Sequence, residues 1–553
     1  MAAVIPAVTF HTAFHAGALK PLHRDHLPSE PKGYRDLKGH IFERQFREAM
    51  QVEMEAVQRH GTWRPVSRPT AHGKVLPLTW VFKYKLNKQG LVTKFKARIC
   101  VRGDLQFWND EDTYAATLAA RSFRLLMALT AKFDLETRQL DAVNAFTNSP
   151  LDEEIYVDWP PGYKNASNSR ECLRLHKALY GLRRSPLLWY RSISSALLRL
   201  GLQAVPEEAC TFKNDWLIVF FYVDDIVLLY RRKDAERTEA FIAGIKALYE
   251  MNDLGELQWF LGIRILRNRA TQRLWLCQDS YIEKIASTYQ LPAGHKAPAT
   301  PLPQETLVKY DKEASHESIH LFQQKVGSMQ YAAVITRPDI ACPASKLAEF
   351  LTNPSSKHHA AADQCLQYLN STRSYALQFN GSPDGPEDLL VATDAAFADT
   401  PDRKSSQGFL VKLFGAPILW KAGKQATVTT STTEAELLSL SAGASELYSL
   451  KRLFQGLEFD LGRPVTTILC DNQQTIRLVT SEIPQLTTRL KHVDIRQHWL
   501  RQEVQAKRLA IEYLPSSEMP ADGLTKALSV QKFRIFVQQL GLVDIKDLLK
   551  DCE

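Results

Sequence analysis

Two adjacent carboxylates, Asp224 and Asp225, lie between two apolar runs in the stretch Trp216–Tyr230. Val, Ile, Phe and Tyr favour strands and Asp favours turns, so the stretch predicts a β-hairpin with an Asp-Asp turn. A membrane helix is rejected, because the run has 15 residues and two central carboxylates are costly in lipid. If the turn faced a third carboxylate, the three acids could bind a pair of divalent cations. A purely structural turn is the alternative for this segment alone.

A third carboxylate of this kind is Asp141, which ends the predicted strand in ETRQLDAVNAF. The alternative is that Asp141 caps a short helix that follows the strand. Between Asp141 and the hairpin lies a segment that is helical on both sides of Gly181, where a glycine could let the backbone approach a ligand closely. Basic side chains beside this glycine could contact phosphates, namely Lys177, Arg183 and Arg184.

A second group of acids lies further along the chain, in a segment where strand and helix patterns alternate. Asp394 falls on a predicted strand, Glu436 on an amphipathic helix, Asp471 at a strand–helix junction and Asp522 before the last helix of this segment. Each acid also has a structural explanation. Glu436 could complete a capping box with Thr433, Asp471 and Asp522 could be N-caps, and Asp394 could be a strand-end turn residue. Taken together, the four carboxylates are a second candidate active site.

The composition is that of a large globular protein that contacts a polyanion. At 553 residues the chain is too long for one core, so three to four domains are expected. The eight Cys are scattered without a CxxC pair, which indicates neither a zinc site nor a disulfide framework and fits a reducing compartment. The net charge of +8 is concentrated in residues 60–106, where ten Lys and Arg accompany one acid. This local basic surface predicts binding to a polyanion, and a merely solvated basic face is the alternative.

Several elements must position the candidate residues. The periodicity predicts amphipathic helices over 42–60 and 119–133, and a basic hairpin with its turn at 87–90. Residues up to about 40 show no periodicity and no secretory signal, although the lack of acids before Asp25 leaves mitochondrial targeting open. A Pro/Gly-rich stretch at 381–388 predicts a domain boundary.

Five motifs occur along the first half of the chain in the order KARICVRG, QLDAVNAF, ALYGLRRSP, FYVDD and NDLGELQWFLGI. In this order and spacing they resemble the reverse transcriptase of copia-type LTR retrotransposons. Further downstream, TDAAFA, STTEAEL, CDNQQTI and ADGLTK resemble the ribonuclease H of the same elements. The resemblance covers about residues 45–530, and without a protease loop or an integrase zinc pattern the chain resembles the C-terminal part of a Pol polyprotein.

The resemblance implies an α+β multidomain fold, with a fingers–palm–thumb polymerase followed by an α/β ribonuclease H-like domain. The boundaries expected from it are a poorly ordered N-terminal segment (1–40), fingers and palm (41–290), thumb and connection (291–385), the ribonuclease H-like domain (386–530) and a C-terminal helical tail (531–553).

The resemblance also implies the chemistry of both sites. It implies RNA-directed and DNA-directed DNA synthesis, and cleavage of the RNA strand of RNA–DNA hybrids, each with two Mg²⁺ or Mn²⁺ ions. The metal ligands and catalytic residues that it implies are Asp141, Asp224 and Asp225 in the polymerase, and Asp394, Glu436, Asp471 and Asp522 in the nuclease. Glu436 is preferred to Glu434 because the Leu-Leu that follows it matches the family's helix.

Substrate-binding residues follow from the same resemblance. They are Lys96 and Arg98 for the incoming triphosphate, Phe146 against a ribose 2′-OH, Gly181 at the template–nucleotide pair, and Tyr222 near the primer terminus. The partners it implies are an RNA template, a DNA primer, an RNA–DNA hybrid and dNTPs, with no membrane; the oligomeric state is not readable from the sequence. The implied location is intracellular, either cytoplasmic within a virus-like particle or nuclear.

A rival hypothesis is a catalytically idle or domesticated element fragment that acts only as a nucleic-acid-binding protein. Loss of activity by decay is disfavoured, because all three polymerase acids and all four nuclease acids are present.

Overall fold

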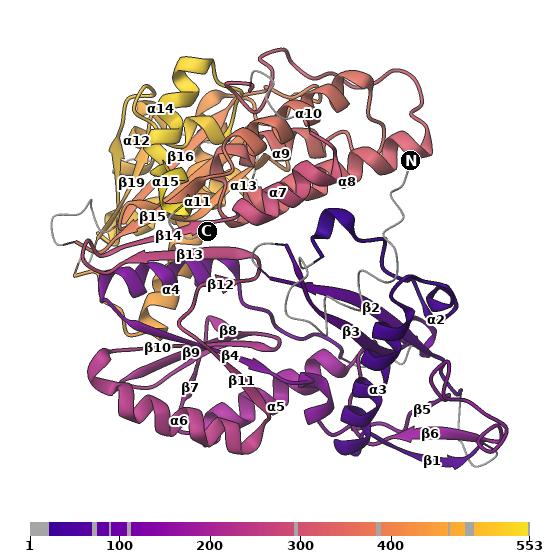
Figure 1. Cartoon of the computed structure of the whole chain (residues 1–553). Helices are drawn as coiled ribbons and strands as arrows, with labels where there is room; N and C mark the ends of the chain where they lie inside the picture. The colour runs from indigo at the N-terminus through magenta and orange to yellow at the C-terminus, as the bar shows by residue number, and fades with distance from the viewer. Residues whose placement is uncertain are drawn as a thin grey trace.

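The computed structural model describes most of the chain, and Figure 1 shows its elements in order. The described residues are 22–550 except 69–73, 88–89, 108–111, 292–296, 383–388, 463–464 and 482–490. Within them, no helix combines the length and the apolar character needed to cross a membrane.

The N-terminal part contains a long helix packed on a β-hairpin. Helix α3 (Glu43–Arg59) buries one face against β3 (Val92–Val101), which pairs antiparallel with β2 (Leu78–Leu86). The contact is aromatic, since the Phe46 and Phe82 rings lie 5.1 Å apart with a steep angle between them. A small sheet, β1 (Trp63–Ser67), β6 (Glu171–Leu175) and β5 (Tyr156–Val157), shares this core. The helix and hairpin predicted from periodicity are therefore present.

The prediction that residues up to 40 are poorly ordered is wrong for residues 22–40, and residues 1–21 lie outside the described residues. A short helix α2 (Tyr34–Leu37) places Leu37 fully inside the N-terminal core. Glu30 accepts a hydrogen bond from the Tyr84 backbone nitrogen (3.0 Å) and forms an ion pair with Lys83. Scattered apolar and acidic residues thus anchor a segment that has no helical or strand period of its own.

The central sheet carries the first group of acids. It has six strands in the order β11 (Met251–Gly255), β4 (Glu136–Ala142), β10 (Asp225–Tyr230), β9 (Leu217–Tyr222), β8 (Glu208–Lys213) and β7 (Gln203–Val205). Figure 1 shows helix α4 (Ala120–Lys132) above this sheet, and α5 (Ser185–Arg199) and α6 (Ala235–Leu248) below it. Both faces of the sheet are covered, which explains why β9 and β10 are apolar along their whole length.

A second sheet and four helices lie between the central sheet and the second half of the chain, and this region is here called the connection. The sheet has the order β12 (Trp259–Phe260), β13 (Ile263–Asn268), β14 (Arg273–Cys277), β15 (Tyr375–Asn380) and β21 (Leu542–Asp544). The helices are α7 (Asp279–Thr288), α8 (His316–Ile335), α9 (Ala341–Ala348) and α10 (Ser356–Ser371). Strand β21 comes from the C-terminal end of the chain and pairs with β15. The expected helical tail is therefore wrong in part, because a strand separates α14 (Val530–Leu540) from α15 (Lys546–Lys550).

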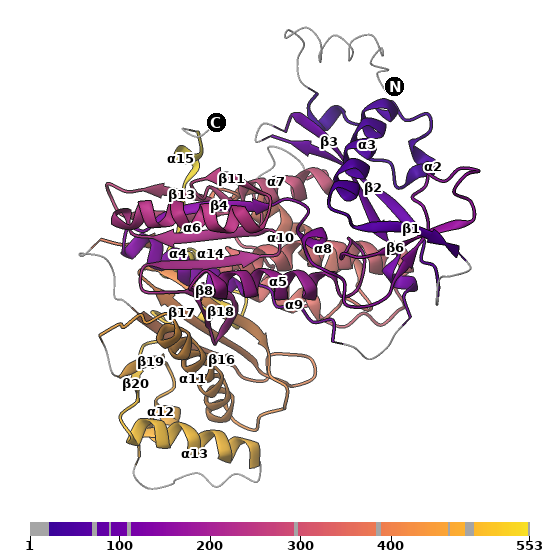
Figure 2. The same cartoon turned by 90° about the horizontal axis from the view of Figure 1, so that it is seen from below.

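The second group of acids lies in a mixed five-stranded sheet of the order β18-β17-β16-β19-β20. Strands β16 (Leu389–Ala396), β17 (Ser406–Leu413) and β18 (Ala416–Lys424) are antiparallel neighbours, whereas β19 (Thr466–Cys470) and β20 (Leu509–Tyr513) run parallel to β16. Helix α11 (Thr432–Gly456) packs on this sheet, and Figure 2 shows α13 (Lys491–Gln505) outside α11. Several packed sheets and helices, with an α/β domain in the second half, confirm the predicted α+β multidomain fold class. Residues 383–388 of the predicted boundary lie outside the described residues.

A buried arginine joins the two halves of the molecule. Arg124 of α4 is 4% exposed and donates to the backbone oxygens of Ile418 (2.8 Å), Val334 (2.7 Å) and Ile335 (2.9 Å). Its guanidinium lies 4.0 Å from the centre of the Trp420 ring of β18. One hydrophobic core runs from the central sheet through the connection into the second half, so the two groups of acids belong to one packed body.

Candidate active sites

Strand register brings the first three acids to one end of the central sheet. Asp225 begins β10 and stands directly opposite Asp141 of β4. The backbone nitrogen of Ala142 donates to the backbone carbonyl oxygen of Asp224 (2.9 Å), and this bond holds the turn beside the end of β4. The three candidate polymerase acids therefore meet, as the chemistry requires. The alternative that Asp141 is a helix cap is not supported, because Asp141 lies within β4.

The hairpin turn differs in detail from the prediction. Its two residues are Val223 and Asp224, since Asp225 already pairs with Tyr222 across the strands. Val223 has a φ of 57°, a conformation that costs a β-branched residue about 1–3 kcal/mol. The indole nitrogen of Trp189 donates to the Val223 carbonyl (2.7 Å) and supports this strained turn. This contact fixes the backbone of the turn that carries Asp224.

The three carboxylates repel one another. Burial and the nearby Asp224 and Asp141 charges raise the pKa of Asp225 to about 6, although the Gln139 amide donates to it (3.3 Å). Burial also raises the pKa of Asp224. The Asn252 amide donates to Asp141 (3.2 Å). Oxygen ligands in this crowded arrangement fit Mg²⁺ or Mn²⁺, whose charge would offset the repulsion.

Replacing Asp225 with Asn should stabilise the metal-free protein in a pH-dependent way. A carboxyl whose pKa is raised in the folded state, from 3.8 to about 6, binds more protons folded than unfolded, so its contribution to stability falls as pH rises through this window. The advantage of Asp225→Asn over the parent should thus be absent near pH 3.8, grow up to about pH 6 and then stay constant. Chemical unfolding of both proteins in chelator at several pH values measures it. An advantage that shrinks with rising pH would contradict the clustering.

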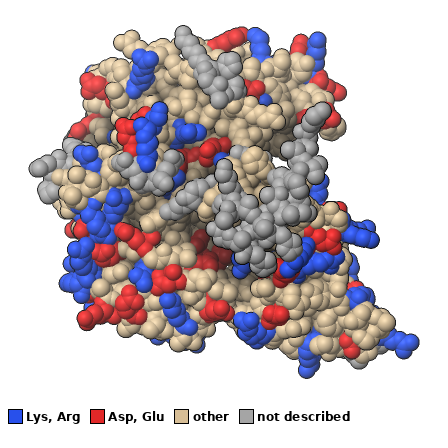
Figure 3. Space-filling view, in the orientation of Figure 1, with Lys and Arg blue, Asp and Glu red and all other residues tan. Residues whose placement is uncertain are grey.

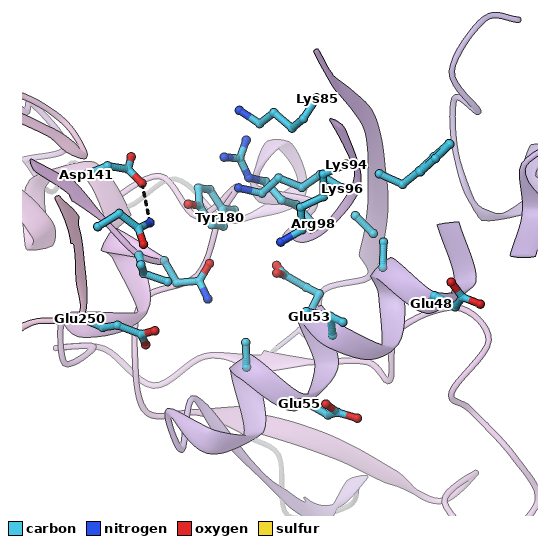
Figure 4. A pocket seen from close by; sticks show the side chains of 18 of the residues that line it. Glu48, Glu53, Glu55, Lys85, Lys94, Lys96, Arg98, Asp141, Tyr180 and Glu250 are labelled. Carbon is cyan, nitrogen blue, oxygen red and sulfur yellow. Dashed lines mark hydrogen bonds between the residues drawn. The ribbon is translucent and has the colours of Figure 1, made fainter. Parts of the chain in front are cut away.

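A cavity of about 780 Å³ opens beside this cluster. Figure 4 shows Lys85, Lys94, Lys96 and Arg98 reaching into it from the β2–β3 hairpin, opposite Asp141. Arg98 lies over the Tyr180 ring at 5.1 Å, and burial together with Arg98 lowers the pKa of Lys96. Cations on one wall and carboxylates on the other are suited to a triphosphate with its metal ions.

Glu53 was missed by the sequence analysis although it belongs to this cavity. It is 7% exposed, accepts a hydrogen bond from the Ile99 backbone nitrogen (3.3 Å), and has a pKa raised by burial. The helical periodicity of the sequence could have identified Glu53, because it places this acid on the buried face of α3 with Met50, Met54 and Val57. An acid on an apolar helix face is costly unless it meets a charge, and here the positive charges of Lys96 and Arg98 partly offset the effect of burial on the pKa of Glu53.

The basic segment 60–106 is only partly available to a polyanion. Arg68 pairs with Asp158 (2.8 Å), Arg102 with Asp104 (2.7 Å) and Lys83 with Glu30. On the face drawn in Figure 3, blue Lys and Arg side chains are mixed with red Asp and Glu. Four further basic side chains of this segment line the cavity, namely Lys85, Lys94, Lys96 and Arg98.

The other predicted substrate residues lie close to the cavity with differing roles. The Phe146 ring packs against Tyr180, with ring centres 4.8 Å apart, and Tyr222 stands opposite Asp225. Arg183 donates to the Gly103 carbonyl (3.0 Å) and Arg184 forms an ion pair with Asp152 (2.7 Å), so both have protein partners where phosphates were predicted. These two predicted phosphate contacts are not supported.

Gly181 is required by the fold. Its φ is 91°, and a Cβ at this position would lie 2.1 Å from the Val101 carbonyl oxygen. Gly181→Ala should therefore cost about 1–3 kcal/mol for backbone strain and a further ~1–3 kcal/mol for the clash. Gly201→Ala is a matched control, because its φ is 86° and nothing lies within 4 Å of the added methyl. Thermal unfolding should show a larger decrease in midpoint for Gly181→Ala; equal decreases would contradict the clash.

The four downstream acids also meet. Asp394 lies on β16, Glu436 on α11, Asp471 directly after β19, and Asp522 at a short turn of helix (Asp522–Leu524). Glu436 and Asp471 have carboxylate oxygens within 4.8 Å of each other. Burial and neighbouring acids raise the pKa of Asp394 to about 6 and that of Glu436 to about 9.

Helix caps do not account for these acids. The N-cap of α11 is Ser431, and the Glu434 carboxylate accepts a hydrogen bond from the Thr430 backbone nitrogen (2.7 Å), so the capping role belongs to Glu434 and not to Glu436. Asn472, not Asp471, caps α12 (Gln473–Thr480). Asp522 follows the N-cap Ala521 and forms an ion pair with Lys526. The structural alternatives weighed for Glu436, Asp471 and Asp522 are therefore wrong.

An unsatisfied oxygen indicates that the second cluster fits a cation. The Glu436 Oε1 atom accepts from the Ala395 backbone nitrogen (3.2 Å), whereas Oε2 is buried without a hydrogen-bond partner. Thr525 donates to Asp394, and Ser516 donates to Asp471 (2.6 Å). Oxygen donors of this kind are the ligands that Mg²⁺ prefers.

Comparison with known proteins agrees with the architecture. Residues 60–303 match the family model "Reverse transcriptase (RNA-dependent DNA polymerase)". The chain is 32% identical over 93% of its length to the Pol polyprotein of transposon TNT 1-94 from Nicotiana tabacum, and covers 39% of it. It is 30% identical over 90% of its length to that of transposon RE1 from Arabidopsis thaliana, covering 34% of it. It is 29% identical over 80% of its length to the Ty1-DR5 Gag-Pol polyprotein from Saccharomyces cerevisiae, covering 26% of it. The chain thus spans about two fifths or less of these relatives.

Among solved structures, the foamy viral protease-reverse transcriptase in complex with RNA/DNA hybrid aligns with 85% of this chain and 54% of its own, at 13% identity and a TM-score of 0.43. LC11-RNase H1, isolated from compost, aligns with 25% of this chain and 94% of its own, at 14% identity and a TM-score of 0.21. Together with the motifs and their placement, the family match over residues 60–303 and the transposon relatives show that the chain carries a copia-type reverse transcriptase domain, of the kind found in the Pol polyproteins of plant and yeast retrotransposons.

Proposed function

We propose that this chain is a two-activity enzyme that copies RNA and DNA templates into DNA and cleaves the RNA strand of RNA–DNA hybrids. The observation that carries the proposal is the pairing of Asp225 with Asp141 beside a cation-lined cavity, in one body with a second carboxylate cluster. Both sites would act with two divalent metal ions, Mg²⁺ or Mn²⁺. These activities are assigned to the chain itself, and the rest of a longer polyprotein would supply others.

At the polymerase site, Asp141, Asp224 and Asp225 would hold the metal ions. When bound, the ions lower the pKa of the primer 3′-OH and stabilise the charge of the displaced pyrophosphate. Lys96 and Arg98 would bind the triphosphate from the opposite wall, where Tyr180 supports Arg98. The rigid β9–β10 turn keeps Asp224 in place, and Tyr222 beside it would contact the primer terminus.

At the nuclease site, Asp394, Glu436, Asp471 and Asp522 would hold the ions. When bound, these activate a water molecule and stabilise the leaving 3′-oxygen. Buried carboxylates with raised pKa values favour a bound cation over an empty site, because the cation offsets their mutual repulsion. Lys526 now neutralises Asp522, so its ammonium would have to move when a metal ion binds there.

The proposed partners are an RNA template, a DNA primer, an RNA–DNA hybrid and dNTPs, and the proposed location is intracellular, in cytoplasmic particles, in the nucleus or in both. Contacts with phosphates should make binding weaken steeply with salt, as counterions are released. The rival function is binding of nucleic acid without catalysis.

The experiment combines two assays on the unmodified chain with Mg²⁺. One measures extension of a primer on an RNA template with dNTPs, and the other measures cleavage of labelled RNA in a hybrid. Extension with cleavage supports the proposal, whereas tight salt-dependent binding without either product supports the rival.

A further inference from the structure

The nuclease cluster contains a sulfur atom next to its carboxylates. Cys470, the last residue of β19, places its Sγ within 4.8 Å of carboxylate oxygens from Glu436 and Asp471. Strand alternation explains the position, because Ile468 and Cys470 point to the buried face, where α11 packs on the sheet. The three ligand atoms thus come from two adjacent residues at a strand end and one residue on the helix above it.

The thiol is not occupied by strong hydrogen bonds. Its recorded contact is a long one of 4.0 Å to the Asn472 carbonyl oxygen. Buried cysteines often serve simply as small apolar residues, and Cys210 and Cys365 lie in apolar cores in this way. Cys470 belongs to the same hydrophobic core, but its Sγ also lies within 4.8 Å of carboxylate oxygens of Glu436 and Asp471.

A second, independent observation points to a cation at this position. Glu436 is 5% exposed, and its Oε2 atom is buried without a hydrogen-bond partner. An unpaired buried carboxylate oxygen is costly, and a cation bound between Glu436, Cys470 and Asp471 would remove that cost.

The ligand chemistry separates one class of cation from another. Mg²⁺ requires oxygen ligands in near-octahedral geometry and gains little from sulfur. Zn²⁺ accepts mixed sulfur and oxygen ligands in a tetrahedral set of four, and thiolates favour soft metals in general. Two carboxylates and one thiolate would leave a fourth position for water or for substrate. On coordination the thiol proton would pass to solvent.

We propose that Glu436, Cys470 and Asp471 form a binding site for a thiophilic divalent cation, Zn²⁺ or Cd²⁺. The site overlaps the position where the proposed nuclease would take Mg²⁺, so occupancy by the softer metal blocks hybrid cleavage while DNA synthesis continues. The effect on cleavage rests on the proposed function, whereas the binding itself does not, and the two are measured separately.

The test is a titration of the full chain with Cd²⁺, without nucleic acid, followed by the ultraviolet thiolate-to-metal charge-transfer absorption and by equilibrium dialysis. The parent should show a saturable band at one Cd²⁺ per chain. Cys470→Ser should lose the band and bind Cd²⁺ at least about tenfold more weakly, in the range seen when metal-site groups are removed. Cys210→Ser is the matched control, a buried thiol of the central sheet, and should keep both signals.

Glu436→Gln should also lose the band, which guards against misfolding of Cys470→Ser as the sole explanation. A band that persists in Cys470→Ser, or a parent that binds no Cd²⁺, would overturn the proposal. Either result would leave the proposed nuclease activity intact, since that is tested with Mg²⁺ and hybrid. Conversely, Cd²⁺ binding with these properties in a chain that cleaves no hybrid would retain the metal site and reject the nuclease.

Discussion

Asp224→Asn should abolish primer extension and leave hybrid cleavage unchanged. Asp224 stands at the strained tip of the β9–β10 hairpin, beside Asp141 and Asp225, where it would hold the metal ions. The change removes one negative charge while keeping the side-chain shape. Metal stabilisation of transition-state charge amounts to several kcal/mol, so the extension rate should fall by roughly a thousandfold or more. Single-turnover extension on a primed RNA template measures this loss.

The matched control for this variant is Asp215→Asn. Asp215 is exposed at the opposite end of the same hairpin, so the identical chemical change there should leave the rate near that of the parent. Unaltered extension by Asp224→Asn would refute the metal role of this residue. Loss of extension in both variants would show that the hairpin, and not the carboxylate, had been disturbed.

Glu436→Gln should remove hybrid cleavage and leave primer extension intact. The glutamine oxygen can still accept from the Ala395 nitrogen, but it cannot supply the negative charge that a buried cation needs. The cleavage rate should fall by roughly a thousandfold, for the same reason as in the polymerase. Because the pKa of Glu436 is raised to about 9, the neutral glutamine should not lower the stability of the metal-free protein.

Glu434→Gln is the natural comparison, two residues away on the same helix. Glu434 accepts from Thr430 in the helix cap, so this variant could lose some stability but should still cleave hybrid. Equal loss of cleavage in both variants would contradict the assignment of Glu436. Joint loss of cleavage and extension in Glu436→Gln would indicate that the two sites are not separate.

Much of this fold and of both sites was predictable from local patterns. The helices α3 and α4 follow from apolar periodicity, and the β9–β10 hairpin follows from two apolar runs around short acids. Local patterns alone do not predict that Asp141 lies opposite Asp225, because they carry no information about strand pairing across more than eighty residues. Local patterns made Asp141 a candidate third carboxylate, the resemblance implied that it joins the other two, and the strand register supplies the physical reason.

What could not be predicted depends on contacts between distant segments. Arg183 and Arg184 were expected at phosphates, but Gly103 and Asp152, far away in sequence, contact them. Residues 22–40 lack a period and are still anchored, because Leu37 packs in a core built by later strands.

The position of β21 determines which C-terminal truncations of the chain leave the connection sheet complete. Leu542–Asp544 forms one edge of the connection sheet, next to Tyr375–Leu377 of β15, so the chain leaves this sheet at residue 380 and returns to it only near its end. A stop codon placed after residue 380 to remove the second carboxylate cluster would also remove strand β21 from the edge of this sheet. The backbone groups of β15 would then lose their partners, and exposed strand edges promote aggregation. An internal deletion that rejoins β15 to β21 would keep this edge paired, but it would still remove β18 from the core that it shares with α4.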